Sequence, residues 1–153
     1  AVVQDTELAL NLVSTYREKC RLSGRLDNMD EVPFFRYVHV ADTEIKAEEN
    51  TKSHIDWIQD IMQWKHHLSD KTEVDQPIDN WRVSRNELPP SFEYIRENRA
   101  FIGSPESVAD KILRLKDKGI SYFGCNFAMG GLSQPEIIQS MALFEKKVMP
   151  LIR

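Results

Sequence analysis

The chain has 153 residues, the size of one ordinary domain, and hydrophobic residues make up 41% of it. A net charge of −4 at pH 7 argues against a nucleic-acid partner, which selects a basic face. No run of about 18 apolar residues is present to span a membrane, and the first residues lack the basic and apolar regions of a signal peptide. The sequence therefore predicts a cytoplasmic protein without nucleic-acid or membrane partners.

The two cysteines both fall in apolar patterns. Cys20 lies in a helical repeat and Cys125 in an apolar run. Buried, reduced thiols are the expectation for such positions. A disulfide between them stays open as the alternative.

The first two elements are a helix and a strand. A helix is predicted from Thr6 to Leu22, with an apolar stripe at four-residue spacing. The stripe consists of Leu8, Leu12, Tyr16 and Cys20. The run from Val32 to Val40 is β-branched and aromatic between turn residues, which predicts a strand.

A long helix and an irregular segment follow. Asp42 or Thr43 can cap a helix that reaches to about Trp64. Its apolar face is predicted to hold Ile55, Ile58 and Met62, and its polar middle, Glu48 to Ser53, is expected in solvent. The stretch from Lys65 to Ala100 contains three prolines and little periodicity. It is expected to be an irregular insertion, either functional or a surface excursion that covers the core.

Regular structure resumes near Phe101. Ser104 and Pro105 predict a helix start, and the apolar run Ile120 to Phe127 predicts a parallel strand buried on both faces. A capping box formed by Ser133 and Glu136 then predicts the start of a last helix. Pro150 is expected to close that helix.

Helices that separate the strands predict an α/β fold with a parallel sheet. Only two convincing strands are present, and two parallel strands cannot be covered on both faces and at both edges. Residues 1–153 are therefore expected to be a single domain or, more specifically, a fragment of a larger one.

Three stretches resemble luciferase-like, flavin-dependent monooxygenases. Residues 37–47, YVHVADTEIKA, resemble the V-A-x-T-x-x-x-A turn of that family, and residues 101–108, FIGSPESV, are similar to its G-[ST]-P-E-x-V helix start. Residues 127–150 resemble its terminus. The three stretches occur in the family's order and spacing, and the resemblance covers most of the chain apart from the insertion and the first few residues.

The resemblance implies the C-terminal portion of a TIM (β/α)8 barrel, in which Val32–Val40 would be the seventh strand and Ile120–Phe127 the eighth. It also implies reduced FMN, or a deazaflavin, as cofactor. The reaction would oxidise a small organic substrate with O2, often in a dimer served by a separate reductase. Because the first six strands are missing, the isolated chain is expected to be inactive. The rival hypothesis is a non-catalytic α/β association module or a proteolytic remnant. As partners we expect a second copy or the missing N-terminal part.

In such a barrel, functional groups lie at the carboxyl ends of the strands. The candidate catalytic residues are His39, a proton carrier or else a packed strand histidine, and Arg36, which is functional if it faces the barrel interior. Candidate cofactor contacts are Asn126, Gly130 and Gly131. Asn126 either contacts the flavin or satisfies loop backbone, and the glycines form either an anion cradle or a plain turn.

No metal site is expected. His66 and His67 are adjacent in the sequence, so on a helix their side chains diverge instead of meeting at one ion.

Overall fold

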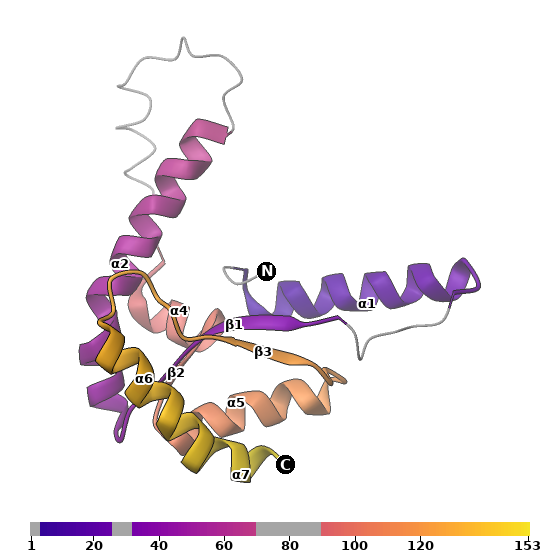
Figure 1. Ribbon diagram of the computed structural model, residues 1–153. Coiled ribbons are helices and arrows are strands. Elements are labelled where there is room, and N and C mark those ends of the chain that lie inside the picture. Colours follow the sequence, from indigo (N-terminus) through magenta and orange to yellow (C-terminus); the bar gives the residue numbers. More distant parts are fainter. Residues whose placement is uncertain (1–3, 26–31, 70–89) are drawn as a thin grey trace.

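Three parallel strands form the sheet, in the order β2–β1–β3 (Figure 1). The computed structural model describes residues 4–25, 32–69 and 90–153, of which residues 60 and 62–69 are described by their backbone alone. The strands are β1 (Phe34–Val40), β2 (Ala100–Gly103) and β3 (Phe123–Asn126). The helices are α1 (Thr6–Leu22), α2 (Glu44–Ser69), α4 (Phe92–Asn98), α5 (Pro105–Asp117), α6 (Gln134–Leu143) and α7 (Met149–Ile152), and the π-helical segment η2 (Phe144–Val148) joins the last two.

The two strands predicted from the sequence are adjacent and parallel, which confirms that expectation. Phe34 to Tyr37 of β1 pair with Phe123 to Asn126 of β3. The second half of β1, Tyr37 to Val40, pairs with β2 on the other side. One strand thus carries both ladders, and the carboxyl ends of all three strands lie at the same edge.

The expectation of two strands and an irregular segment up to Ala100 is wrong in its last part. Ser91 accepts a hydrogen bond from Tyr94 N at 3.1 Å and starts helix α4, after which β2 begins at Ala100. Residues 70–89 lie outside the described residues. A four-residue strand is too short to show a period of two, so β2 is recognisable only by its partner.

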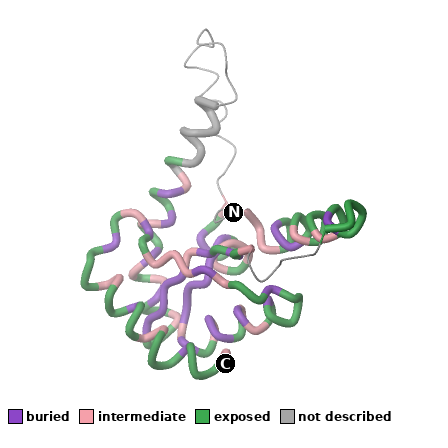
Figure 2. The backbone as a smooth tube through the Cα atoms, turned by 45° about the vertical axis from the view of Figure 1, so that its right-hand side comes forward, coloured by how far each residue is buried: buried purple, intermediate pink, exposed green. Residues whose placement is uncertain are grey.

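Two apolar cores cover the two faces of the sheet. Val38 and Val40 of β1 pack with α5 and η2, through residues such as Val108 and Val148. On the other face, Tyr37 and Ile102 pack with α2 and α4. Figure 2 shows buried residues concentrated in the strands and the helices next to them, whereas α1 is largely exposed. Helices therefore lie on both faces of this sheet.

The apolar stripe expected on α1 does not face the core. Ala9 and Leu10 are buried, as is Cys20, but Leu8 is 50% exposed and Leu12 52% exposed. Four-residue spacing identified the helix and its bounds, but burial depends on what the helix packs against. α1 projects away from the rest of the molecule, so that most of its surface meets solvent (Figure 1).

Other sequence expectations have mixed outcomes. The caps at Ser104 and Ser133 are confirmed, including the reciprocal capping box with Glu136.

Phe123 and Cys125 are only partly buried because β3 is an edge strand. Both cysteines are free thiols, and burial raises the pKa of Cys125 to about 11. Pro150 does not close the last helix: it sits in the first turn of α7.

A side chain of α6 accepts a hydrogen bond from the backbone of β1. Val40 N donates a 2.8 Å hydrogen bond to Ser140 Oγ, and Ser140 is 1% exposed. β3 ends at Asn126, opposite Tyr37, so it offers no carbonyl this far along β1. Ser140 thereby fixes α6 to the carboxyl end of the central strand.

We expect Ser140→Ala to lower the free energy of unfolding by about 1–3 kcal/mol, because it leaves the buried Val40 N–H without an acceptor. Urea denaturation followed by circular dichroism measures this loss. Gln139→Ala, on the exposed face of the same helix, is the control and should change stability little. Equal stability of the two variants would contradict the anchoring role of Ser140.

Candidate functional site

The candidate site lies where β1 and β3 end side by side. β1 leads through Ala41 to Thr43 into α2, and β3 leads through residues 127–132 into α6. In open parallel sheets, ligands bind outside the carboxyl ends of the strands, between connections that leave toward opposite faces. β1 continues to α2 on one face, and β3 continues to helices that reach the other. This edge holds His39 and Asn126.

His39 is enclosed at this edge. It is 1% exposed, and its Nε2 lies 3.1 Å from Asn50 Nδ2 on α2. Its Nδ1 is buried and has no hydrogen-bond partner within the described part of the chain. Burial lowers the pKa of His39; Glu136 opposes this shift, and His54 adds to it. The imidazole is therefore neutral at neutral pH.

The contact with Asn50 determines which ring nitrogen carries the proton. An amide Nδ2 can only donate, so His39 Nε2 must accept. In a neutral imidazole the other nitrogen is then protonated. His39 thus holds an Nδ1–H donor that has no acceptor in the described residues. A buried donor of this kind suits the oxygen of a ligand or an ordered water.

Arg36 faces the other side of β1. It is fully buried, its Nη1 donates to Phe35 O at 2.8 Å, and its guanidinium lies 4.2 Å from the centroid of the Phe34 ring. Its Nε is 3.4 Å from Thr6 Oγ1 on α1. Burial lowers the pKa of Arg36 to about 10, and Asp5 opposes the shift, so the group stays charged. Arg36 and His39 are three residues apart on a strand and do not converge on one site.

Asn126 stabilises the loop that follows β3, and its contact with a flavin stays a prediction. Its Oδ1 accepts a 3.1 Å hydrogen bond from Ala128 N, which orders the loop after β3. The side chain is only partly buried. Its Nδ2 group makes no hydrogen bond within the described residues.

Gly130 and Gly131 allow helix α2 to approach the loop. A Cβ on Gly130 would overlap the Trp57 ring, and one on Gly131 would lie 2.6 Å from His54 Nδ1. Gly131 also has a φ of +92°, which side chains rarely adopt. The pair therefore brings His54 and Trp57 to the carboxyl edge. Its role as an anion cradle stays a prediction.

Three helices, α2, α5 and α6, begin at this edge, and a carboxylate accepts a hydrogen bond at the N-terminus of α5 and of α6. Glu44 Oε1 accepts a 2.7 Å hydrogen bond from Ser104 N at the start of α5. Burial raises the pKa of Glu44, but hydrogen bonds from Ser104 and Ser107 outweigh it and the net shift is downward. Glu136 accepts from Ser133 N at 2.9 Å, and the Ser133 hydrogen bonds lower its pKa. Both positive helix ends already hold an anion from the chain itself.

Asn50 and His54 were not predicted as part of this site, whereas Trp57 was expected either to line a substrate lid or to serve in packing. The expectation that residues 48–53 are solvated is confirmed for Glu49, Lys52 and Ser53, which are exposed. It is wrong for Thr51, which is fully buried, and for Asn50, which is half-buried against His39. The spacing of the three residues by four and then three places them on one helix face. That spacing was the available signal, but it does not tell which loop the face would meet.

The described residues were also compared with the requirements of a metal site and of a membrane-spanning helix. Within residues 4–25, 32–69 and 90–153, no three His, Cys, Asp or Glu side chains are placed to hold a metal ion. The side chains of His66 and His67, named in the sequence analysis, lie outside the described residues. The helices in the same ranges are too short or too polar to cross a bilayer.

Two solved structures share the fold of nearly the whole chain. One is the monooxygenase RslO1 of Streptomyces bottropensis, with a TM-score of 0.60, 16% identity, and coverage of 94% of this chain and 38% of that one. The other is the oxygenating constituent of 3,6-diketocamphane monooxygenase from the CAM plasmid of Pseudomonas putida, a type II Baeyer–Villiger enzyme in complex with FMN. Its TM-score is 0.61 at 20% identity, with 92% and 39% coverage.

At such identities the likeness shows the fold alone. The α/β arrangement with its parallel sheet is consistent with part of a TIM barrel, and the chain spans less than two fifths of the length of either monooxygenase. No protein-family model matches the sequence, and no curated protein matches it.

We expect nitrogen NMR at neutral pH to find His39 protonated at Nδ1, because Asn50 can only donate to Nε2. Asn50→Asp replaces this donor by a carboxylate, which should move the proton to Nε2 and raise the pKa of His39. The resonances of the other three histidines serve as controls. Protonation of Nε2 in the unaltered chain would contradict the assignment.

Proposed function

We propose that this chain is the C-terminal part of a flavin-dependent, luciferase-like monooxygenase that oxidises a small organic substrate with reduced flavin and O2. The observation that carries the proposal is the fold shared, over more than nine tenths of the chain, with two monooxygenases, one of them solved with FMN. The three sequence stretches that resemble the family support it independently of the fold.

The exposed sheet surface suits the ring system of a flavin. Phe35 is 41% exposed and lies over Gly124 of β3, where a Cβ would overlap its ring. Tyr37 and Asn126 follow toward the carboxyl edge on the same face and are half-buried. These residues offer aromatic contact and an amide donor. A reduced flavin bound here would supply the electrons that activate O2.

The phosphate of FMN fits this chain poorly. Glu44 and Glu136 hold the N-termini of α5 and α6, and a phosphate placed there would meet an ionised carboxylate. Gly130 and Gly131 lie next to the Glu136 end. We therefore assign the phosphate contacts to residues outside this chain, for FMN and for a deazaflavin alike.

In this proposal His39 binds the substrate or the flavin ring through its Nδ1–H. The lowered pKa keeps the ring neutral, so a neutral carbonyl oxygen suits it better than an anion, which the nearby Glu136 would repel. Asn50 holds the tautomer. Arg36, on the opposite face of β1, acts as a catalytic group only if a partner brings substrate to that face.

We expect no monooxygenase turnover by the isolated chain, because it lacks phosphate contacts and most of the barrel. Reduced FMN, O2 and a panel of aldehydes should yield no product above background. The same chain titrated with FMN and with riboflavin, which lacks the phosphate, should quench flavin fluorescence equally. Turnover by the chain alone would contradict the inactive-segment hypothesis, and quenching of neither flavin would favour the association module.

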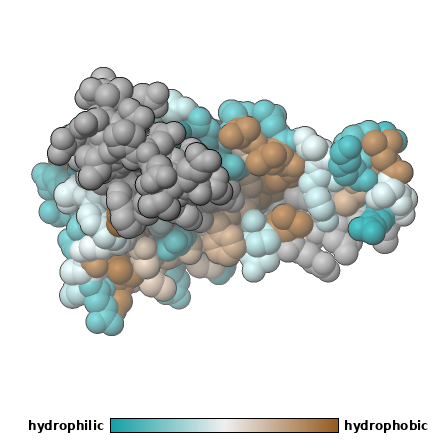
Figure 3. Space-filling view, turned by 90° about the horizontal axis from the view of Figure 1, so that it is seen from above, coloured by the Kyte–Doolittle hydropathy of each residue, from teal (hydrophilic) through white to brown (hydrophobic). Residues whose placement is uncertain are grey.

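Association of the chain is supported by apolar surface that no described element covers. Leu8 and Leu12 lie one turn apart on α1, each about half exposed. On β1, Phe34 is buried, whereas its neighbour Phe35 is 41% exposed. In Figure 3, hydrophobic surface is concentrated in the middle of the viewed face and again at the end where α1 projects. The edge strands β2 and β3 add unpaired backbone groups.

We expect sedimentation at low micromolar concentration to give a mass above that of one 153-residue chain, because burying the exposed half of each leucine gains roughly 1 kcal/mol. Leu8→Glu combined with Leu12→Glu should restore the monomer without unfolding it. Ile138→Glu, at an equally exposed position on α6, is the control. A stable monomer of the unaltered chain would refute this part of the proposal.

A further inference from the structure

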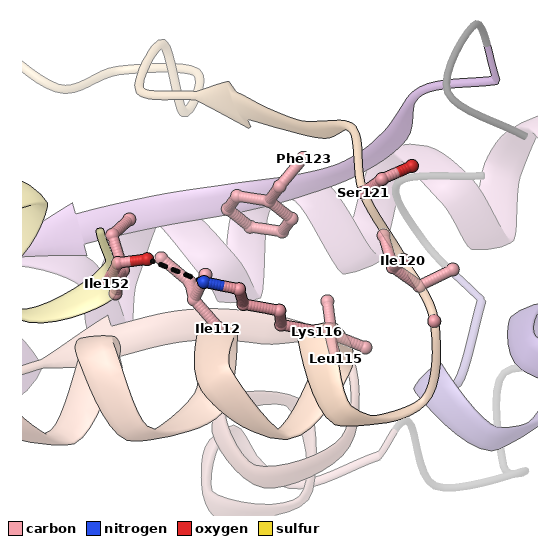
Figure 4. Close-up of a pocket in the computed structure, with 8 residues that line it drawn as sticks. Ile112, Leu115, Lys116, Ile120, Ser121, Phe123 and Ile152 are labelled. Carbon is pink, nitrogen blue, oxygen red and sulfur yellow. Dashed lines mark hydrogen bonds between the residues drawn. The ribbon is translucent and has the colours of Figure 1, made fainter.

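A cavity opens at the amino end of β3, the edge opposite to His39. It has a volume of about 490 Å³ and lies between the end of α5, the approach to β3 and the end of α7 (Figure 4). Five apolar side chains form its walls: Ile112, Leu115, Ile120, Phe123 and Ile152. Phe123 is held by stacking on Phe101, at 5.2 Å between ring centroids. Its volume lies within the range of small-molecule sites, and one side of it is open to solvent.

The charge at the mouth of this cavity is positive. Lys116 is the one ionisable residue that lines it, and its aliphatic stem crosses the opening in Figure 4. Its Nζ donates to Ile152 O at 3.4 Å, a long hydrogen bond for an exposed ammonium with three donors. Gly119, also in the lining, accepts a 2.8 Å hydrogen bond from Arg17 Nη2, which brings a second cation to the rim.

We propose that this cavity binds a free medium-chain carboxylate, with the alkyl tail against the five apolar walls and the carboxylate on Lys116. At about 30 Å³ for each heavy atom, the volume admits roughly ten to sixteen of them, and decanoate has twelve. The site shares no residue with the carboxyl edge, so it does not depend on the proposed flavin chemistry.

The combination of walls and charge favours this ligand over simpler ones. A small inorganic anion would make no use of the apolar walls, of which Phe123 and Ile152 are partly exposed. A purely apolar occupant, such as a leucine from a second copy, would cover the Lys116 stem without a counter-charge. An amphiphilic carboxylate satisfies both parts of the lining, because its tail removes apolar area from water while its head pairs with the ammonium at the rim.

The test is a titration of the full chain with decanoate, below its micelle-forming concentration, and with decanol as the uncharged analogue. Isoleucine methyl groups are observed by NMR. We expect saturable shifts at Ile112, Ile120 and Ile152 with both ligands, and tighter binding of decanoate. Isoleucines far from the cavity, such as Ile55 and Ile58 on α2, should not shift.

Three variants separate the contributions. Lys116→Gln should weaken decanoate binding by up to about fivefold, as for one exposed ion pair, and leave decanol binding unchanged. Ile152→Ala should weaken both ligands, because it removes a wall. Lys118→Gln is the matched control: this neighbouring lysine pairs with Glu7 and does not line the cavity.

Several outcomes would overturn the proposal. Equal effects of the Lys116 and Lys118 substitutions would indicate adsorption to a basic surface. Shifts that do not saturate, or that appear first at the exposed leucines of α1, would indicate non-specific detergent-like binding. If the isoleucine methyl groups do not shift, and the associated form of the chain keeps the ligand out of the cavity, then a second copy fills the cavity.

Discussion

The pairing of β1 with a parallel neighbour on each side is the constraint on which the rest of the structure depends. Its first half pairs with β3 and its second half with β2. This double ladder directs Val38 and Val40 into one core and Tyr37 and His39 to the other face. Beyond the end of β3, Ser140 supplies the acceptor that the ladder lacks. The pairing of β1 therefore determines both the position of α6 and that of His39.

Features decided within three or four residues were predictable from the sequence. The caps at Ser104 and Ser133 follow from such local interactions. β2 was not predictable, since four residues become a strand only by pairing with β1. The exposure of Leu8 and Leu12 was missed for a related reason: periodicity defines a helix face, whereas burial depends on what lies opposite.

The candidate site likewise has one part that local sequence patterns indicate and one part that they do not. Its location follows from parallel strands, whose carboxyl ends share an edge, and this much the sequence indicated. The proximity of His39 to Asn50 depends on how α2 lies against the sheet, which no local pattern encodes. The glycine pair was ambiguous between an anion cradle and close packing. His54 and Trp57 give a packing reason for both glycines.

The two carboxylates at the helix ends decide what this edge can contribute. Glu44 and Glu136 each hold a helix N-terminus, with a pKa below the usual range, so both are ionised at neutral pH. They stabilise the chain by the same helix-end electrostatics that would otherwise attract a phosphate. A neutral imidazole donor and an exposed aromatic surface remain next to them. In the proposed function, this edge therefore takes uncharged, planar or carbonyl-bearing groups, and the anionic part of the proposed cofactor requires positive charge from elsewhere.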